Sequence, residues 1–82
     1  MTLYFDFEEQ RRTANVMWPE DTGSIEVTLA DQELIKKLPS DLIFDINTRN
    51  KISYIIENPD HKRLIQLQKI IGKRLQEFAN QL

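Results

Sequence analysis

Hydrophobic and polar residues alternate along the first eighteen residues of the chain, a pattern typical of β-strands that are buried on one face. The first apolar row comprises Leu3, Phe5 and Phe7, and the second comprises Ala14, Val16 and Trp18. A four-residue loop at residues 9–12 would place residue 7 opposite 14, residue 5 opposite 16 and residue 3 opposite 18. That register joins both rows on one face, so we expect a hairpin with Trp18 in the core.

A third strand and a short helix are predicted next. Ile25, Val27 and Leu29 alternate with polar residues after the loop-forming sequence Pro-Glu-Asp-Thr-Gly-Ser. Residues 31–38 then have apolar positions at helical spacing, with Asp31 as a suitable N-cap and Pro39 as a terminator.

A second hairpin is predicted within residues 42–56. Its inward rows are Leu42, Phe44 and Ile46 on one strand and Ile52, Tyr54 and Ile56 on the other. These rows oppose each other only across a loop of odd length, which favours residues 48–50 with Asn50 in the left-handed conformation. The same register places Ile43 opposite Ile55 on the other face.

The C-terminal segment predicts an amphipathic helix from about residue 59 to about residue 80. Asn58 suits the N-cap and Pro59 the first helical position. The apolar positions lie within one narrow arc and comprise Leu64, Leu67, Ile71, Leu75, Phe78 and Leu82. Gly72 lies inside this helix, where it costs about 1 kcal/mol relative to alanine, and we expect a neighbouring element to approach closely there.

These elements predict a single α+β domain over residues 1–82, in the order β-β-β-α-β-β-α. We expect two layers: a mostly antiparallel five-stranded sheet, with the short helix and the long C-terminal helix on one face. The inward rows of five strands need more cover than an eight-residue helix offers, so the apolar arc of the long helix is assigned to the core.

The charge is distributed unevenly along the chain. Residues 1–60 contain six Lys or Arg and twelve Asp or Glu, a charge of −6, whereas residues 61–82 contain five and one, a charge of +4. Lys62, Lys69 and Lys73 lie on the polar side of the predicted C-terminal helix, so a nucleic-acid-binding module is the alternative hypothesis. The isoelectric point of about 5.3 and the lack of aromatic residues among these lysines disfavour it.

The sequence offers little catalytic chemistry. It has no cysteine and one histidine, which excludes a disulfide framework and a typical zinc site. The Asp-Thr-Gly triplet at residues 21–23 occurs in aspartic proteases, but here Pro-Glu precedes it instead of an apolar strand, so a β-turn is expected. His61 is expected to be a solvent-exposed residue of the first helical turn. We therefore expect no enzyme activity, no metal and no cofactor.

Two apolar pairs fall on the outer face of the predicted sheet and indicate an interaction surface. The hairpin registers pair Tyr4 with Met17 and Ile43 with Ile55, with Glu8, Glu9, Glu20 and Asp21 as a polar rim. The functional hypothesis is a non-catalytic protein-interaction or regulatory module, acting on a protein partner or as a homodimer. No apolar stretch is long enough to cross a membrane, and the N-terminal residues do not resemble a secretory signal, so a cytoplasmic location is expected.

Overall fold

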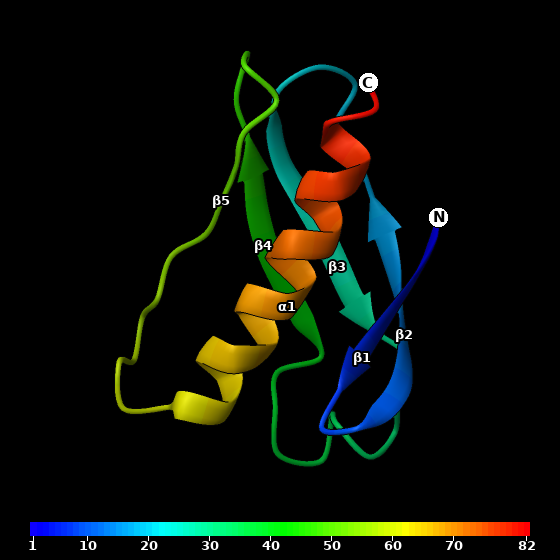
Figure 1. The fold of residues 1–82 in the computed structure, drawn as a ribbon. Helices are drawn as coiled ribbons and strands as arrows, with labels where there is room; N and C mark the ends of the chain where they lie inside the picture. Colours follow the sequence, from blue (N-terminus) through cyan, green and yellow to red (C-terminus); the bar gives the residue numbers. More distant parts are fainter.

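The computed structural model describes all residues 1–82 and contains five strands and one helix (Figure 1). The elements are β1 (Thr2–Phe7), β2 (Gln10–Met17), β3 (Gly23–Leu29), β4 (Asp41–Ile46), β5 (Ile52–Ser53) and α1 (Lys62–Ala79). All neighbouring strands pair antiparallel in chain order, β1-β2-β3-β4-β5. The predicted α+β class and the five-stranded sheet are therefore confirmed, and β3 and β4 are antiparallel neighbours.

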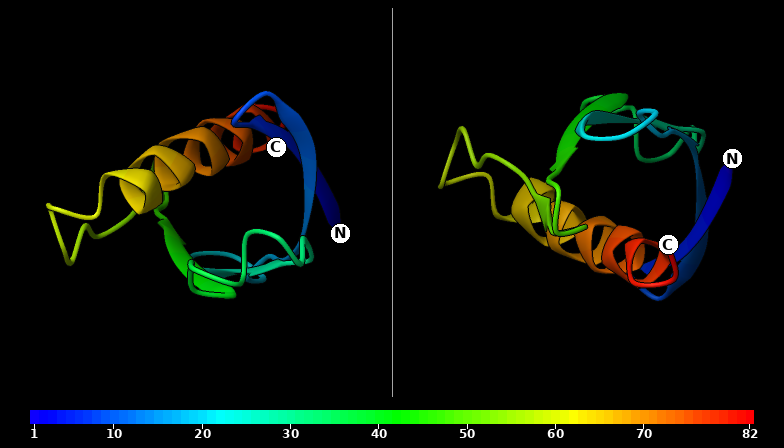
Figure 2. Two further views of the ribbon diagram at one scale, coloured as in Figure 1. Left: turned by 90° about the horizontal axis from the view of Figure 1, so that it is seen from below. Right: turned by 90° about the horizontal axis from the view of Figure 1, so that it is seen from above.

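The sheet curls around its apolar face, and α1 lies across the side that the strands leave open (Figure 2). The helix contacts β1 and β5, the two outermost strands. This arrangement differs from the predicted two flat layers, because strand twist brings the outer strands toward each other and one helix then covers both. The apolar core is enclosed between the concave face of the sheet and α1.

The predicted short helix at residues 31–38 does not form. Residues 32–37 make consecutive turns, in which Asp31 Oδ1 accepts hydrogen bonds from the amides of Glu33 (2.9 Å) and Leu34 (3.2 Å). The capping role of Asp31 is thus as predicted, but so short a segment gains too few intrahelical bonds to offset the cost of nucleation. Leu34 and Leu38 are nevertheless buried in the core.

The first hairpin has a tighter turn than predicted. Glu8 and Glu9 form a two-residue connection with φ of 53° and 64°, so Phe7 pairs with Gln10 and Leu3 pairs with Ala14. The predicted pairing of residue 3 with 18 is wrong by four residues. A shift by an even number leaves every side chain on its predicted face, because strand side chains alternate with a period of two.

The second hairpin has the predicted register. Ile46 pairs with Ile52 and Asp45 with Ser53, and Asn50 adopts a positive φ of 59°. The amide of Asn47 donates to the carbonyl of Lys51 (3.2 Å), which encloses the expected three-residue loop. However, β5 contains two residues only, and the chain leaves the sheet after Ser53.

The helix begins later than predicted. His61, not Asn58, is the N-cap, and its Nδ1 accepts a hydrogen bond from the amide of Leu64 (3.4 Å). Asn58 instead accepts from the amide of Asp60 (3.0 Å) in a local turn, which leaves Pro59 outside the helix. His61 is half-buried rather than fully exposed, because capping holds its ring against the first turn.

The C-terminal helix covers the core as expected. Leu67, Ile71, Leu75 and Ala79 are completely buried. Trp18 is half-buried at the margin of the core, where its Nε1 donates to the sulfur of Met1 (3.2 Å). The expectation for Gly72 is confirmed, because a Cβ there would lie 3.2 Å from Cε1 of Tyr54.

Candidate interaction surface

Three outer-face residues form a row across the middle of the sheet. Met17 on β2 pairs with Glu26 on β3, and Glu26 pairs with Ile43 on β4. Met17 is 67% exposed and Ile43 is 51% exposed. Both line one shallow depression together with Glu26, Thr28 and Asp41. The convex face, opposite α1, therefore carries two large apolar side chains with a carboxylate between them.

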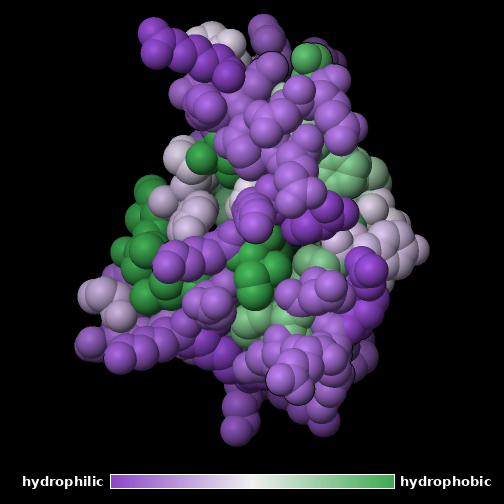
Figure 3. Space-filling model, in the orientation of Figure 1, coloured by the Kyte–Doolittle hydropathy of each residue, from purple (hydrophilic) through white to green (hydrophobic).

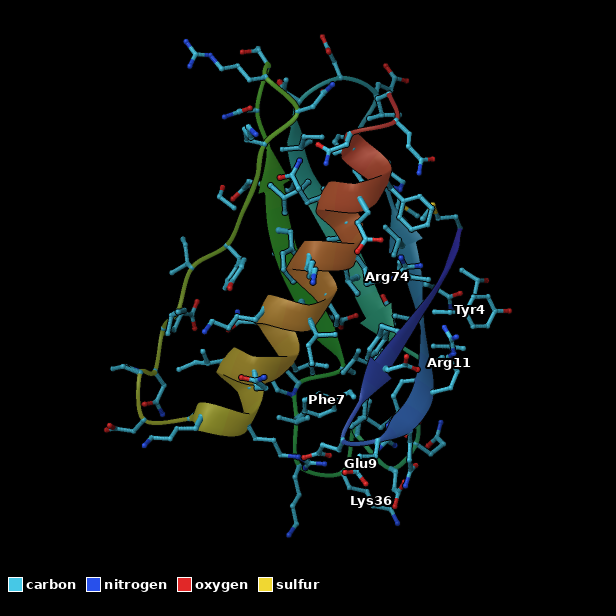
Figure 4. The ribbon with its side chains drawn as sticks, viewed as in Figure 1. Tyr4, Phe7, Glu9, Arg11, Lys36 and Arg74 are labelled. Atoms are coloured by element: carbon cyan, nitrogen blue, oxygen red, sulfur yellow. The ribbon has the colours of Figure 1, made fainter.

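Tyr4 does not join this row. It is exposed, but its cross-strand neighbour is Thr13 and not Met17. Thr13 and Met17 are four residues apart on β2, which corresponds to roughly 13 Å along a strand. Figure 4 shows the ring of Tyr4 pointing away from the sheet and from α1. The predicted Tyr4–Met17 pair is therefore wrong, because it depended on the shifted register of the first hairpin.

Ile55 lies near Ile43 across a cleft, not in a continuous strand ladder. The cleft has a volume of about 440 Å³ and lies between β4 and the segment at residues 54–58; we call it the β4 cleft. Its apolar lining includes Ile43, Ile55, Ile56 and Leu64. Figure 3 shows hydrophobic surface at the left edge of the molecule, along the segment that follows β5. Ile55 is 72% exposed there.

The charged residues that line the β4 cleft all carry the same sign. They are Asp41 and Asp45 on β4 and Glu57 on the opposite wall, with no lysine or arginine among the lining residues. Continuing the register of the second hairpin would place Asp41 directly opposite Glu57. Like charges in that position destabilise a strand pair, so this register is disfavoured at the Asp41 end of β4.

The segment after β5 first contacts both β4 and α1, through Tyr54, and is then bonded to α1 at Ile55. The ring of Tyr54 packs edge-on against Phe44, with centroids 5.4 Å apart, and it also lies against Gly72 of the helix. Gln68, which is buried, donates from Nε2 to the carbonyl of Ile55 (3.2 Å). Sequence reasoning missed Gln68, because a glutamine beside an apolar arc is usually solvated.

The helix also binds both outer strands through side chains. Gln76 Oε1 accepts from the amide of Ile52 (2.9 Å), and its Nε2 donates to the carbonyl of Asn50 (2.8 Å). On the opposite side, Arg74 Nε donates to the carbonyl of Tyr4 on β1 (3.0 Å; residues labelled in Figure 4). These side chains form hydrogen bonds with backbone groups on the outer sides of β1 and β5. A further strand would otherwise bind to those groups.

A buried arginine joins the hairpin tip to the turn segment. Arg12 is 4% exposed and donates from Nη1 to Asp31 Oδ2 and Glu33 Oε2 (both 3.1 Å), and from Nε to the carbonyl of Phe7 (3.4 Å). Burial lowers the pKa of Arg12, but the hydrogen bonds to the two carboxylates outweigh burial and leave the pKa above its ordinary value. The sequence does indicate an inward position for Arg12, because it lies two and four positions from Ala14 and Val16, which face the core from the same strand.

Two carboxylates near Arg12, those of Asp31 and Glu8, have lowered pKa values. For Asp31, burial raises the pKa, but the hydrogen bonds from Arg12 and from the Leu34 amide outweigh burial and leave the pKa below its ordinary value of 3.8. A hydrogen bond from Arg63 lowers the pKa of Glu8; this pair is bidentate, with distances of 2.8 and 2.7 Å. The cluster connects the first hairpin, the turns and the start of α1, and we interpret it as structural.

The three lysines of the alternative hypothesis are all exposed on α1. No lysine takes part in a salt bridge, so Lys62, Lys69 and Lys73 remain available to a ligand.

Asp21 lies in an exposed bend before β3, where Gly23 adopts a positive φ of 124°. No group of three or more His, Asp or Glu side chains is arranged to hold a metal ion.

Comparisons with protein-family models, curated proteins and solved structures find no match to this chain. The interpretation of the surface therefore rests on its geometry and charge. As for membranes, α1 lacks the continuous apolar length that a spanning helix requires.

Proposed function

We propose that this protein is a non-catalytic interaction module that binds a protein partner through the convex face of its sheet. The row formed by Met17, Glu26 and Ile43 carries this proposal. Both apolar side chains of the row are well exposed, whereas the apolar side chains of β1 to β4 that face the concave side are all buried. An apolar row beside the β4 cleft and bordered by polar side chains has the character of an interaction site.

The charges of the convex face favour a basic partner. Glu26, Asp41 and Asp45 project from β3 and β4 around Ile43. Two copies of this face stacked directly on each other would bring these carboxylates together, which costs binding energy. A homodimer would instead have to place the lysines of α1 from one copy against the acidic face of the other, a head-to-tail contact.

The proposal is tested with the double variant Met17→Ser/Ile43→Ser. Affinity capture from a cell extract with the wild-type protein as bait should enrich proteins that this variant no longer captures. Tyr4→Ser is the matched control, since it removes an equally exposed apolar side chain outside the row. Light scattering coupled to size exclusion would detect self-association. A monomer whose double variant captures the same proteins as the wild type contradicts the proposal.

The exposed and unpaired lysines of α1 support one alternative, binding of nucleic acid. Three phosphate contacts would give weak binding that falls steeply with salt concentration. A gel-shift assay at about 50 mM salt is therefore the most sensitive condition. Binding that disappears in the triple variant Lys62→Gln/Lys69→Gln/Lys73→Gln would favour this alternative, and absence of binding in the wild-type protein would eliminate it.

A further inference from the structure

Strand β4 has an edge that neither β5 nor α1 covers. The strand is six residues long, but only Asp45 and Ile46 pair with β5. Residues 41–44 therefore have no strand partner on that side. The backbone of residues 54–57, which forms the other wall of the β4 cleft, makes no backbone hydrogen bond to β4.

The backbone groups that face this open edge can be assigned from the alternation of the ladder. The amide of Leu29 donates to the carbonyl of Ser40 (2.7 Å), so even-numbered residues of this strand direct their backbone groups toward β3. Odd-numbered residues then face the β5 side, in agreement with the bond between Asn47 and Lys51. The N–H and C=O groups of Asp41 and Ile43 accordingly point into the β4 cleft.

These backbone groups have the spacing that a further strand needs. The sets on Asp41 and Ile43 are two positions apart along β4, which is the repeat of hydrogen-bonded pairs along an antiparallel strand. The cleft volume of about 440 Å³ lies within the range of about 300–1,000 Å³ that is usual for binding sites. Its walls combine apolar side chains with three carboxylates, so a strand placed there would meet both apolar surface and negative charge.

We propose that the β4 cleft binds an extended peptide segment of the partner, which pairs with β4 as an additional strand. This inference rests on the proposed function and specifies how the partner is held. The charges define the segment: its outward residue opposite Asp41 is basic and its outward residue opposite Ile43 is apolar, and the pairing ends before Asp45, which already pairs with Ser53. Its inward residues are apolar, because they face the lining that includes Leu42 and Leu64.

The chain's own residues 54–57 cannot take this place at equal energy. They would put Glu57 opposite Asp41, whereas the proposed segment puts a cation there. The carbonyl of Ile55 is also already bonded to Gln68 of α1, so pairing with β4 would compete with that hydrogen bond. The open edge is therefore maintained by the contacts that hold residues 54–57 on α1.

A blocked peptide of sequence Lys-Val-Ile-Val-Lys is a suitable probe, because its pattern reads the same in both strand directions. Titration into ¹⁵N-labelled protein should shift the amide signals of Ile43 and Ile55 and slow hydrogen exchange at Ile43. N-methylation of the central isoleucine should weaken binding by about tenfold or more, since it removes a backbone hydrogen bond and blocks the edge. Replacing both lysines by glutamate should weaken binding similarly.

Protein variants separate strand addition from binding elsewhere on the face. Ile43→Pro removes the N–H that points into the cleft and leaves the bonds to β3 in place, so it should abolish binding, whereas Ile43→Ser, which shortens the same exposed side chain but keeps the N–H, should only weaken it. Asp45→Lys changes one exposed side chain of the cleft lining and keeps Glu57 opposite Asp41, and it should reduce the preference for the lysine peptide over the glutamate peptide. Met17→Ser lies outside the cleft and should bind the peptide as the wild type does.

Three results would overturn this inference. The first is no amide shift at Ile43 at about 1 mM peptide, a level that detects even weak complexes. The second is slow hydrogen exchange at Ile43 in the free protein, which would show that the edge is already paired. The third is binding that Met17→Ser weakens but N-methylation does not; the convex face would then bind without strand addition, and the proposed function would stand while this inference fails.

Discussion

Arg12 faces the core from β2, on the same side of the strand as Ala14 and Val16. An apolar residue would be expected at such a position. Its guanidinium is satisfied by Asp31, Glu33 and the carbonyl of Phe7, and no buried side-chain nitrogen or oxygen atom in the protein lacks a partner. A buried charge is tolerated when it is paired and hydrogen-bonded in this way. Arg12 thereby attaches the turns at residues 32–37 to the first hairpin in place of a helix.

Replacing Arg12 by methionine should lower the free energy of unfolding by roughly 2–4 kcal/mol, because Asp31 and the carbonyl of Phe7 lose their partner while partly buried. Urea denaturation measures the change. Arg11→Met is the control, since Arg11 is exposed and pairs with Asp6 at the surface, where such pairs contribute at most about 1 kcal/mol. Equal effects of the two substitutions would show that the cluster around Arg12 stabilises the fold no more than the exposed pair of Arg11 and Asp6 does.

The lowered pKa of Asp31 predicts how the free energy of unfolding changes in acid. Its pKa in the folded protein lies below the ordinary value of 3.8, so its ionised form stabilises the fold. That contribution is complete above about pH 5 and is lost as the pH falls through 3.8 toward the folded-state pKa. Unfolding free energies measured from pH 6 to pH 2 should therefore decline more steeply in the wild type than in Asp31→Asn, which retains a capping side chain. Parallel declines would contradict this prediction.

At the scale of elements, sequence patterns predicted the strands well and their ends poorly. The register of the second hairpin was predicted correctly because Asn50 marks a left-handed position, but its second strand ends at Ser53 and not at Ile56 as predicted. The register of the first hairpin failed because Arg12 was counted as part of a charged loop, and because two glutamates occupy a turn that usually contains Asn or Gly. The predicted start of α1 was wrong because Asn58 caps a local turn through the Asp60 amide, whereas His61, a residue type not usually favoured as an N-cap, accepts from the Leu64 amide.

The edges of the sheet could not be predicted from the sequence, because they depend on contacts between distant segments. Gln68, Gln76 and Arg74 have no pattern that distinguishes them from solvated helix residues, yet Gln68 lines the β4 cleft and the other two bond to the outer strands. The predicted outer-face pairs had mixed outcomes: Ile43 and Ile55 do lie near each other, whereas Tyr4 and Met17 do not.

Gln76→Ala should destabilise the protein by about 1–2 kcal/mol, because the amide of Ile52 and the carbonyl of Asn50 lose their partners. Hydrogen exchange at the Ile52 amide should accelerate more than exchange at amides of β2 and β3. Gln66→Ala is the matched control, an exposed glutamine on the same helix, and should change stability by less than about 0.5 kcal/mol. Unchanged exchange at Ile52 in Gln76→Ala would show that this contact does not stabilise β5.

At the scale of the whole molecule, five strands and one helix enclose a single core of 17 buried apolar residues. The contacts of α1 with β1 connect segments that are far apart in the sequence, such as Arg74 with Tyr4, 70 residues away. Neighbouring strands, by contrast, are joined by short connections. The sheet can therefore form from local hairpins, but its closure requires the helix.

Ile71→Ala should reduce the free energy of unfolding by about 2–5 kcal/mol, because the side chain is completely buried between α1 and the sheet. This is a large part of the roughly 5–15 kcal/mol available to a small domain. Lys69→Ala, an exposed position nearby, should have little effect. If Ile71→Ala unfolds α1 while the strand amides remain protected from exchange, the sheet is stable without the helix and the single-core description is wrong.

The position of α1 after all five strands has a consequence during protein synthesis. Each hairpin can assemble as soon as it leaves the ribosome, but the outer edge of β1 stays uncovered until Arg74 has been translated and has reached Tyr4. A nascent chain at this stage exposes an unpaired strand and an apolar concave surface, the features that promote aggregation. Slow translation of the helix codons should therefore lower the soluble yield more than slow translation of any strand.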